Sequence, residues 1–152
     1  MAIKILIVDD HEVVREGIRT ILRARPEWEV CGEAADGQQA VALAQECNPD
    51  VVILDVTMPV MNGLDAAQQI VKSGLATKLL IFTMHDSRGL MKSVRKIGAK
   101  GIVLKSYAAR DLIRALEAIL DGGTFFPDDS RESGQEQGGP GGLMFCQAFE
   151  FA

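Results

Sequence analysis

The sequence is poor in the features that mark several protein classes. Only three of its 152 residues are cysteines, and Cys31, Cys47 and Cys146 lie far apart without a Cys-x-x-Cys pair. This argues against a disulfide framework or a zinc site, and we interpret Cys31 and Cys47 as small core residues. No apolar run is long enough to cross a bilayer, and Ile3–Val8 is too short for the core of a signal peptide. We therefore expect a cytoplasmic protein without a membrane partner.

The charge is mildly acidic rather than strongly biased. The net charge is -5 at pH 7, with 24% charged and 47% hydrophobic residues. Such a balance is typical of soluble globular domains and differs from that of disordered chains. Because DNA affinity depends largely on lysines and arginines that neutralise phosphates, we do not expect this segment to bind DNA itself.

Short apolar segments alternate with segments of helical spacing. Five of the short segments predict strands: Ile3–Val8, Glu29–Ala34, Val51–Leu54, Leu79–Thr83 and Ile102–Leu104. Between them apolar residues recur at helical intervals, Gly98 marks a helix end, and Asp36 with Gln39 resembles a capping pair. Asp86 or Ser87 is expected to cap the fourth helix. The alternation predicts an α/β fold with a doubly wound, five-stranded parallel sheet and helices on both faces.

Composition divides the chain into two parts. Residues 1–126 carry the alternating pattern and are expected to form one domain. Asp128–Gly142 is polar and rich in glycine, whereas Leu143–Ala152 is apolar again without a clear period. Since domains begin at about 50 residues, we expect residues 127–152 to be a flexible or non-native C-terminal tail.

Polar side chains stand at the ends of four predicted strands. Asp9 and Asp10 follow the first strand, Asp55 follows the third, Thr83 ends the fourth, and Lys105 follows the fifth. Ligands of open parallel sheets bind beyond the carboxyl ends of the strands, so these side chains should converge. Three close carboxylates repel one another unless a cation lies among them, and Mg2+ prefers oxygen ligands. A carboxylate can attack phosphorus, while a lysine and a hydroxyl contact the phosphoryl oxygens.

Each of these residues also has an ordinary interpretation. Asp10 could cap the first helix, and Asp55 could be a turn residue after its strand. Thr83 could simply end its strand, and Lys105 could be a surface charge. Five matches at strand ends favour the functional interpretation over all of these.

Several motifs resemble the receiver domain of two-component response regulators, over nearly all of residues 1–126. They are Ile5–His11, Asp50–Pro59, Met61–Gly63, Phe82–His85 and Gly98–Gly101 leading to Lys105. The resemblance implies the flavodoxin-like strand order 2-1-3-4-5. It makes Asp55 the phosphoacceptor, Thr83 the switch hydroxyl and Lys105 the contact to the phosphoryl group. The Mg2+ ligands that it implies are Asp9, Asp10, Asp55 and the backbone carbonyl of Thr57.

The segments Val14–Ile18 and Thr83–Asp86 resemble the NarL/FixJ subfamily in particular. This resemblance implies a sensor histidine kinase as the phosphoryl donor and allows a homodimer. It also implies that DNA is contacted only through a helix-turn-helix output domain, which this chain lacks. We expect the tail to mark an expressed fragment or a frameshifted product rather than a natural single-domain protein. The alternative is that Met144, Phe145, Phe149 and Phe151 form a docking peptide.

Two features qualify the resemblance. Ile102 stands where many receivers have an aromatic residue, which puts the usual coupling between Thr83 and the outer face in question. His11 and His85 flank the predicted site, but two histidines without a third ligand make a poor metal site. We expect these histidines only to tune the local polarity.

Two other functions compete with a signalling receiver. The first is an aspartate-nucleophile phosphatase of the haloacid-dehalogenase type, which needs a second carboxylate two residues after the first. This chain has Thr57 there. The second is a phosphorylation-independent binding module, which Ile102 alone supports. We expect a phosphoacceptor that assists only its own phosphorylation and dephosphorylation, and not a conventional enzyme.

Overall fold

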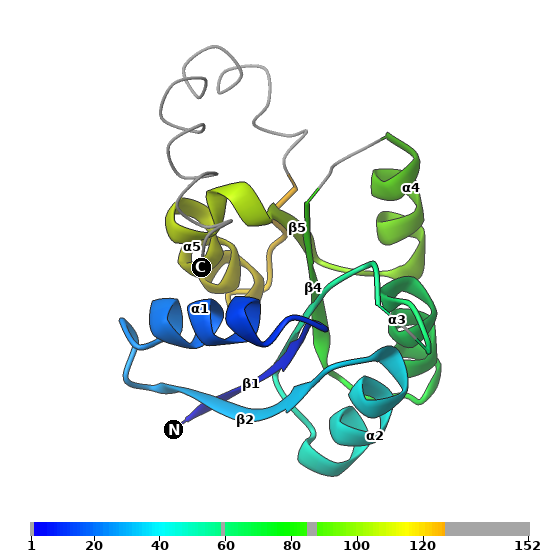
Figure 1. Cartoon of the computed structure of the whole chain (residues 1–152). Coiled ribbons are helices and arrows are strands. Elements are labelled where there is room, and N and C mark those ends of the chain that lie inside the picture. The colour runs from blue at the N-terminus through cyan, green and yellow to red at the C-terminus, as the bar shows by residue number, and fades with distance from the viewer. Residues whose placement is uncertain (1, 59, 85–87, 127–152) are drawn as a thin grey trace.

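The computed structural model describes residues 2–58, 60–84 and 88–126, in which five strands alternate with five α-helices (Figure 1). The elements are β1 (Ile3–Val8), α1 (Glu12–Leu22), β2 (Trp28–Ala34), α2 (Gly37–Cys47), β3 (Val51–Leu54), α3 (Gly63–Lys72), β4 (Lys78–Thr83), α4 (Arg88–Ile97), β5 (Gly101–Leu104) and α5 (Ala108–Leu120). A short 3-10 helix, η1 (Lys105–Tyr107), connects β5 to α5. All five predicted strands are confirmed. The expected cap at Asp86 or Ser87 and the expected tail lie outside the described residues.

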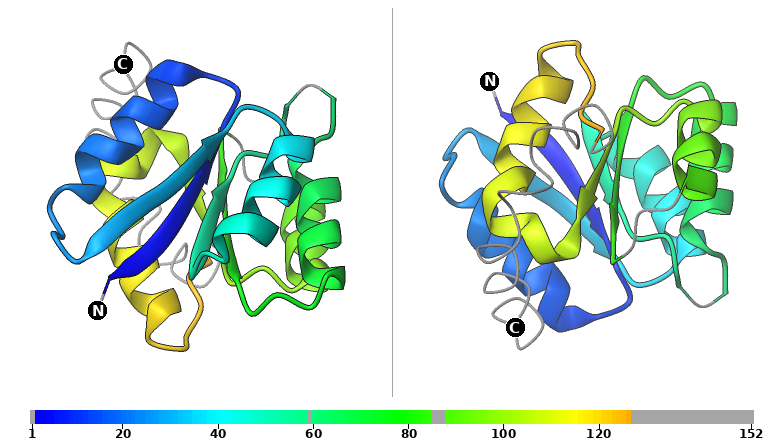
Figure 2. Two further views of the ribbon diagram at one scale, coloured as in Figure 1. Left: turned by 90° about the horizontal axis from the view of Figure 1, so that it is seen from below. Right: turned by 90° about the horizontal axis from the view of Figure 1, so that it is seen from above.

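The strands form one parallel sheet in the order β2-β1-β3-β4-β5, as predicted. Helices α1 and α5 cover one face, and α2, α3 and α4 cover the other (Figure 2). Successive strand residues point to opposite faces, so one strand supplies both cores. In β1, for example, Leu6 and Val8 pack beneath α2 and α3, whereas Ile5 and Ile7 pack beneath α1 and α5. Burial on both faces explains the continuous apolar runs.

Capping hydrogen bonds mark the start of α2, and a glycine in the left-handed region marks the end of α4. The Asp36 carboxylate accepts the backbone N–H of Gln39 at 2.8 Å, and the Gln39 side-chain oxygen accepts the N–H of Ala35 at 3.0 Å. This pair confirms the predicted cap of α2. Gly98 follows α4 with φ of 104°, a conformation that glycine adopts without steric cost.

Among the described residues, no helix combines the length and the apolar character that a membrane span would need.

The segment after α5 adds an unpredicted pairing beside β5. The N–H of Phe125 donates to the carbonyl of Lys100 at 2.9 Å, and the N–H of Ile102 donates to the carbonyl of Phe125 at 2.8 Å. The next residue, Phe126, is buried in the core beneath α4, and the Arg95 guanidinium lies 4.0 Å from the centre of its ring. The chain up to Phe126 therefore contributes to the packed core.

The loop between β3 and α3 passes directly beside Asp55. A Cβ atom on Gly63 would lie 1.9 Å from the backbone oxygen of Asp55, which no side chain can tolerate. The N–H of Gly63 donates to the carbonyl of Val56 at 2.7 Å, so the loop is closed on itself at this point. Glycine is thus required by the close approach of two backbone segments, as expected for loop geometry.

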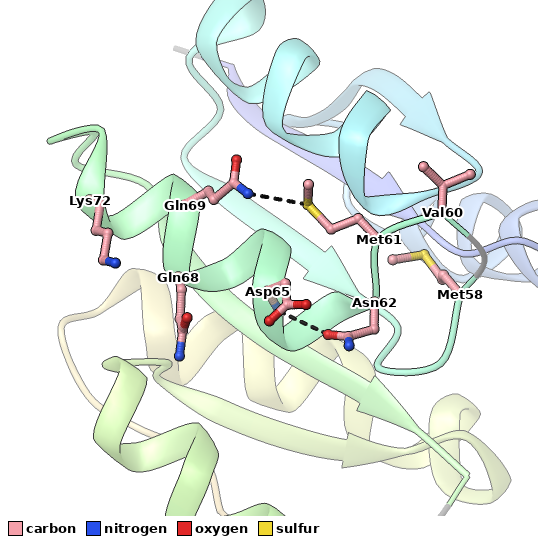
Figure 3. A pocket seen from close by; sticks show the side chains of 8 residues that line it. All are labelled: Met58, Val60, Met61, Asn62, Asp65, Gln68, Gln69 and Lys72. Carbon is pink, nitrogen blue, oxygen red and sulfur yellow. Dashed lines mark hydrogen bonds between the residues drawn. The ribbon is translucent and has the colours of Figure 1, made fainter.

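The same loop holds Val60 in the left-handed region, with φ of 68° and 77% of the residue exposed. Val60 lines a hollow of about 530 Å³, to which Met58, Met61 and the exposed side of α3 also contribute (Figure 3). The strand-end acids Asp9, Asp10 and Asp55 do not line this hollow. A β-branched residue in this conformation is a true outlier, and it stores steric strain in the loop.

Replacing Val60 by glycine should therefore stabilise the protein by about 0.5–1 kcal/mol, because relief of about 1–2 kcal/mol of strain exceeds the entropy cost of glycine. Urea unfolding of the wild type and of Val60→Gly measures the change. Val13 provides the matched control, because it is also exposed but lies within the helix α1. Val13→Gly should lose about 0.5–1 kcal/mol. Destabilisation by both substitutions would show that residue 60 carries no strain.

Candidate functional site

The predicted site residues lie at one edge of the sheet. Asp9 and Asp10 directly follow β1, Asp55 directly follows β3, and Lys105 directly follows β5. These strands and β4 are parallel neighbours, and Thr83 at the end of β4 lies level with the last residue of β5. The carboxyl ends of four strands therefore bring the predicted side chains to the same edge.

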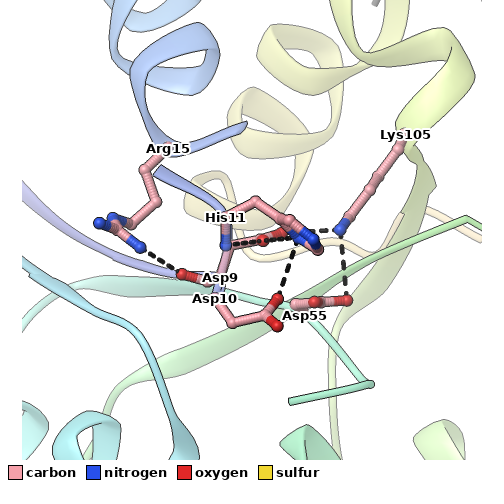
Figure 4. A network of polar contacts seen from close by, with 6 residues as sticks. All are labelled: Asp9, Asp10, His11, Arg15, Asp55 and Lys105. Carbon is pink, nitrogen blue, oxygen red and sulfur yellow. Dashed lines mark hydrogen bonds and ion pairs between the residues drawn. The ribbon is translucent and has the colours of Figure 1, made fainter. Parts of the chain in front are cut away.

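Lys105 joins the acids of two strands (Figure 4). Its Nζ lies 2.7 Å from Oδ2 of Asp9 and 3.4 Å from Oδ1 of Asp55. Asp9 is 0% exposed, and Asp55 and Lys105 are each 5% exposed. A charge this deeply buried is stable only when an opposite charge compensates it. Lys105 is thus no surface lysine, and the ordinary interpretation of this residue is wrong.

Asp55 is the titrating group whose surroundings perturb it most clearly. Burial raises the pKa of the Asp55 carboxyl from 3.8 to about 6, and the negative charge of Asp9 adds to this rise. Lys105 and the backbone N–H of Thr57, which donates to the Asp55 carboxylate, act in the opposite direction but only partly offset it. The carboxyl group is therefore mostly ionised at neutral pH and yet poorly solvated.

The donor set fits a divalent cation. Lys105 contacts the carboxylates of Asp9 and Asp55, and an oxygen of the Asp10 carboxylate lies within 4.8 Å of one from Asp9. Oδ1 of Asp10 and Oδ2 of Asp9 are buried and accept no hydrogen bond of good geometry, although Oδ2 of Asp9 forms the ion pair with Lys105. Buried acceptors in folded proteins normally have a donor or a cation. An oxygen-preferring ion such as Mg2+ would satisfy them.

The remaining predicted residues flank this cluster. Thr83 is buried at the end of β4, and its role as the switch hydroxyl stays a prediction. Thr57 is exposed, and its N–H rather than its carbonyl is the group in contact with Asp55, so the carbonyl as a metal ligand stays a prediction. Ile102 is fully buried within the core on the α4 side of the sheet.

Arg15 also supports the site, although the sequence did not predict it. Its Nη1 donates to the backbone carbonyl of Asp9 at 2.6 Å, and its Nε donates to Oε1 of Glu33 at 3.0 Å. Glu33 also binds Arg19, so two arginines of α1 meet one carboxylate of β2. Arg15 thereby holds the loop that carries Asp9 and Asp10. Its position one helical turn after the acids was the only available signal, because Glu33 is distant in the sequence.

Comparisons with known proteins now bear on this site. The family model described as the response regulator receiver domain matches residues 5–117. The chain belongs to this family. Receiver domains are signalling domains rather than classical enzymes, so the phosphatase hypothesis has no support.

Individual relatives agree with the predicted subfamily. The receiver domain is 38% identical over 123 residues to the transcriptional regulatory protein DegU of Brevibacillus brevis, which covers 81% of this chain and 52% of DegU. It is 33% identical over 118 residues to the nitrate/nitrite response regulator protein NarL of Escherichia coli, which covers 78% of this chain and 55% of NarL. The chain thus spans about half the length of these curated relatives.

A solved structure gives the same answer for the fold. The receiver domain resembles a two-component response regulator of the LuxR family from Aurantimonas sp., with a TM-score of 0.81 and 38% identity. The alignment covers 90% of this chain and 99% of that chain. The flavodoxin-like strand order that the resemblance implied is confirmed by the sheet and by this likeness.

Proposed function

We propose that this protein is cytoplasmic and that its Asp55 accepts a phosphoryl group from a phosphohistidine of a sensor histidine kinase. A carboxylate oxygen of Asp55 attacks phosphorus, the P–N bond of the donor breaks, and the imidazole leaves with the electron pair, so that an aspartyl phosphate forms. The observation that carries this proposal is the contact of Lys105 with both Asp9 and Asp55 at the sheet edge. That contact brings the acceptor and its charge partners together from three strands.

Mg2+ is the cofactor that we assign to the reaction. Asp9, Asp10, Asp55 and the carbonyl of Thr57 would hold it, in keeping with the buried Oδ1 of Asp10, which has no hydrogen-bond donor. When bound, Mg2+ neutralises charge on the carboxylates and on the phosphoryl oxygens. Lys105 adds a fixed positive charge within reach of Oδ1 of Asp55, where the negative charge of the transferred group would develop.

Phosphorylation would then shift an equilibrium between two conformations. The new charge on Asp55 would draw Lys105 and the Thr83 hydroxyl inward and change the surface near α4, β5 and α5. Ile102 is already fully buried before phosphorylation. It would therefore not turn inward, as the aromatic residue at this position of many receivers does when the switch hydroxyl moves. Homodimer formation, the control of DNA through an output domain outside this chain, and self-catalysed dephosphorylation stay predictions.

Intact-mass analysis after incubation with acetyl phosphate and Mg2+ tests the proposal. The wild type should gain the mass of one phosphoryl group, and Asp55→Asn should gain none, because the amide is no nucleophile towards phosphorus. Asp65→Asn is the matched control, since Asp65 is an exposed acid of the neighbouring helix α3. It should be labelled like the wild type. Labelling of Asp55→Asn, or none of the wild type, would overturn the assignment.

The same experiment separates a receiver from a phosphorylation-independent binding module. A module of that kind would bind its partner equally well before and after labelling. A receiver should change its partner affinity or its oligomeric state when Asp55 is labelled, which size-exclusion chromatography of the two forms can detect.

A further inference from the structure

His11 faces the acidic pair from the turn between β1 and α1. Its Nδ1 lies 3.0 Å from Oδ1 of Asp10 and 3.3 Å from Oδ1 of Asp9 (Figure 4). These three atoms all lie within 4.8 Å of one another. The backbone N–H of His11 also donates to Oδ1 of Asp9 at 2.9 Å, which fixes the residue against the acid beside it.

Hydrogen bonding explains only part of the ring position, because Nδ1 forms one long hydrogen bond, of 3.3 Å, with Oδ1 of Asp9. The shorter contact, to Asp10, does not have hydrogen-bonding geometry, and Oδ1 of Asp10 is left buried without a donor. The ring does not cap α1 either, although His11 precedes the helix. In the described part of the chain, the ring nitrogen Nδ1 has polar contacts with these two carboxylates, and 67% of the side chain is exposed.

The same spacing suits ligands of one ion. Neighbouring ligand atoms of an octahedral ion with bonds of about 2.1 Å lie about 3.0 Å apart. Nδ1 of His11 stands at nearly this distance from both acidic oxygens, without hydrogen-bonding geometry to the nearer one. A cation between these three atoms would meet two carboxylate oxygens and one imidazole nitrogen, and it would satisfy the buried oxygen of Asp10.

We infer that His11 is a third side-chain ligand and shifts the metal preference of this site from Mg2+ towards borderline ions such as Mn2+, Co2+ and Zn2+. The inference rests on the proposed metal site and deepens it. Imidazole nitrogen adds affinity for these transition ions, whereas Mg2+ gains little from it because it prefers oxygen. With Nδ1 on the metal, the ring proton sits on the exposed Nε2.

Calorimetric titration of the metal-free chain with Co2+ and, separately, with Mg2+ tests this inference. His11→Asn keeps a side chain that can hydrogen-bond the acids but removes the nitrogen ligand. It should raise the dissociation constant for Co2+ by about tenfold or more, while that for Mg2+ changes by less than about threefold. Glu12→Gln, which removes an exposed charge from the next residue, is the control and should change the affinities for both ions by a similar small factor.

Proton NMR of the Co2+-loaded chain gives a direct readout. The wild type should show one strongly shifted, exchangeable resonance from the Nε2 proton of a coordinated imidazole, and His11→Asn should lack it. Equal changes in Co2+ and Mg2+ affinity, unchanged Co2+ affinity, or an unshifted ring proton would each overturn the inference and leave His11 a charge partner of the acids.

Failure of the proposed function would look different. Asp10→Asn should weaken both ions together, because the acid binds either one. Acetyl phosphate labelling of the control Glu12→Gln in Mg2+ should match that of the wild type. If the wild type binds Co2+ through His11 but is never labelled by acetyl phosphate, the phosphoacceptor proposal is wrong and the inference about His11 still holds.

Discussion

Replacing Lys105 by methionine is expected to destabilise the metal-free protein by about 3–5 kcal/mol. Methionine replaces the aliphatic stem of lysine but has no ammonium group, so the carboxylate of Asp9 would remain fully buried without its partner at 2.7 Å. Asp55 would lose its compensating charge as well, and the two acids would repel each other directly. Urea unfolding at pH 7 in the presence of a chelator measures the loss.

Lys78→Met is the matched control. Lys78 donates from Nζ to the backbone carbonyl of Ile119 at 3.1 Å, and it is partly buried. Losing one hydrogen bond to a neutral acceptor should cost only about 1 kcal/mol. Equal losses in the two variants would show that Lys105 acts through packing and that the ion pair contributes nothing.

A second variant isolates the charge. Asp9→Asn removes the acid that Lys105 contacts most closely, so the double variant Asp9→Asn, Lys105→Met should be more stable than Lys105→Met alone. If Asp9→Asn fails to restore stability, the buried charge of Asp9 is not the cause of the loss.

Much of this site could be predicted because strand ends in a parallel sheet share an edge. The run of apolar residues in β1 and β3 indicated burial on both faces, which in turn placed Asp9, Asp10 and Asp55 at one end of the sheet. Neither step required knowledge of side-chain orientation. The fold and the identity of the cluster therefore followed from periodicity and chain direction.

What could not be predicted depends on contacts between distant segments. The clamp of Arg15 on Asp9 relies on Glu33 from β2, and no local pattern links the two. The return of Phe125 to β5 likewise pairs residues far apart in the chain. The ring of His11 could only be interpreted once its direction towards the acids was known.

Val60 shows the opposite case, in which local preference is overridden. Valine disfavours a positive φ, so a valine at position 60 did not indicate that the loop adopts a left-handed conformation there. The loop adopts it because Gly63 must approach the backbone of Asp55, which leaves few paths for the residues between them. The packing of this loop around Asp55 thus holds Val60 in a conformation that valine disfavours.

Asp55 itself should make the metal-free protein less stable as the pH rises. Its pKa is about 6 in the folded state and 3.8 in the unfolded reference, so between about pH 4 and pH 6 the native protein binds more protons than the unfolded chain. Stability from this group therefore falls through that window and is fully lost above it. A difference of about two pKa units corresponds to about 3 kcal/mol.

Asp55→Asn removes this penalty, because the amide is neutral at every pH. The variant should exceed the wild type in unfolding free energy by up to about 3 kcal/mol at pH 7.5, and the excess should vanish near pH 4. Urea unfolding of both proteins across this range, with a chelator present, measures it. Added Mg2+ should narrow the gap at pH 7.5, since a ligand that binds the native acids stabilises the wild type by mass action.

A pH-independent difference between the two proteins would contradict the origin assigned to the raised pKa. The expected pH dependence has one origin. Asp55 is buried beside Asp9, and both acids share the single positive charge of Lys105. The burial that makes the ionised acid costly also leaves it poorly solvated as a nucleophile. Phosphorylation by acetyl phosphate and Mg2+ should accordingly decline at acidic pH, where the same carboxyl group takes up its proton.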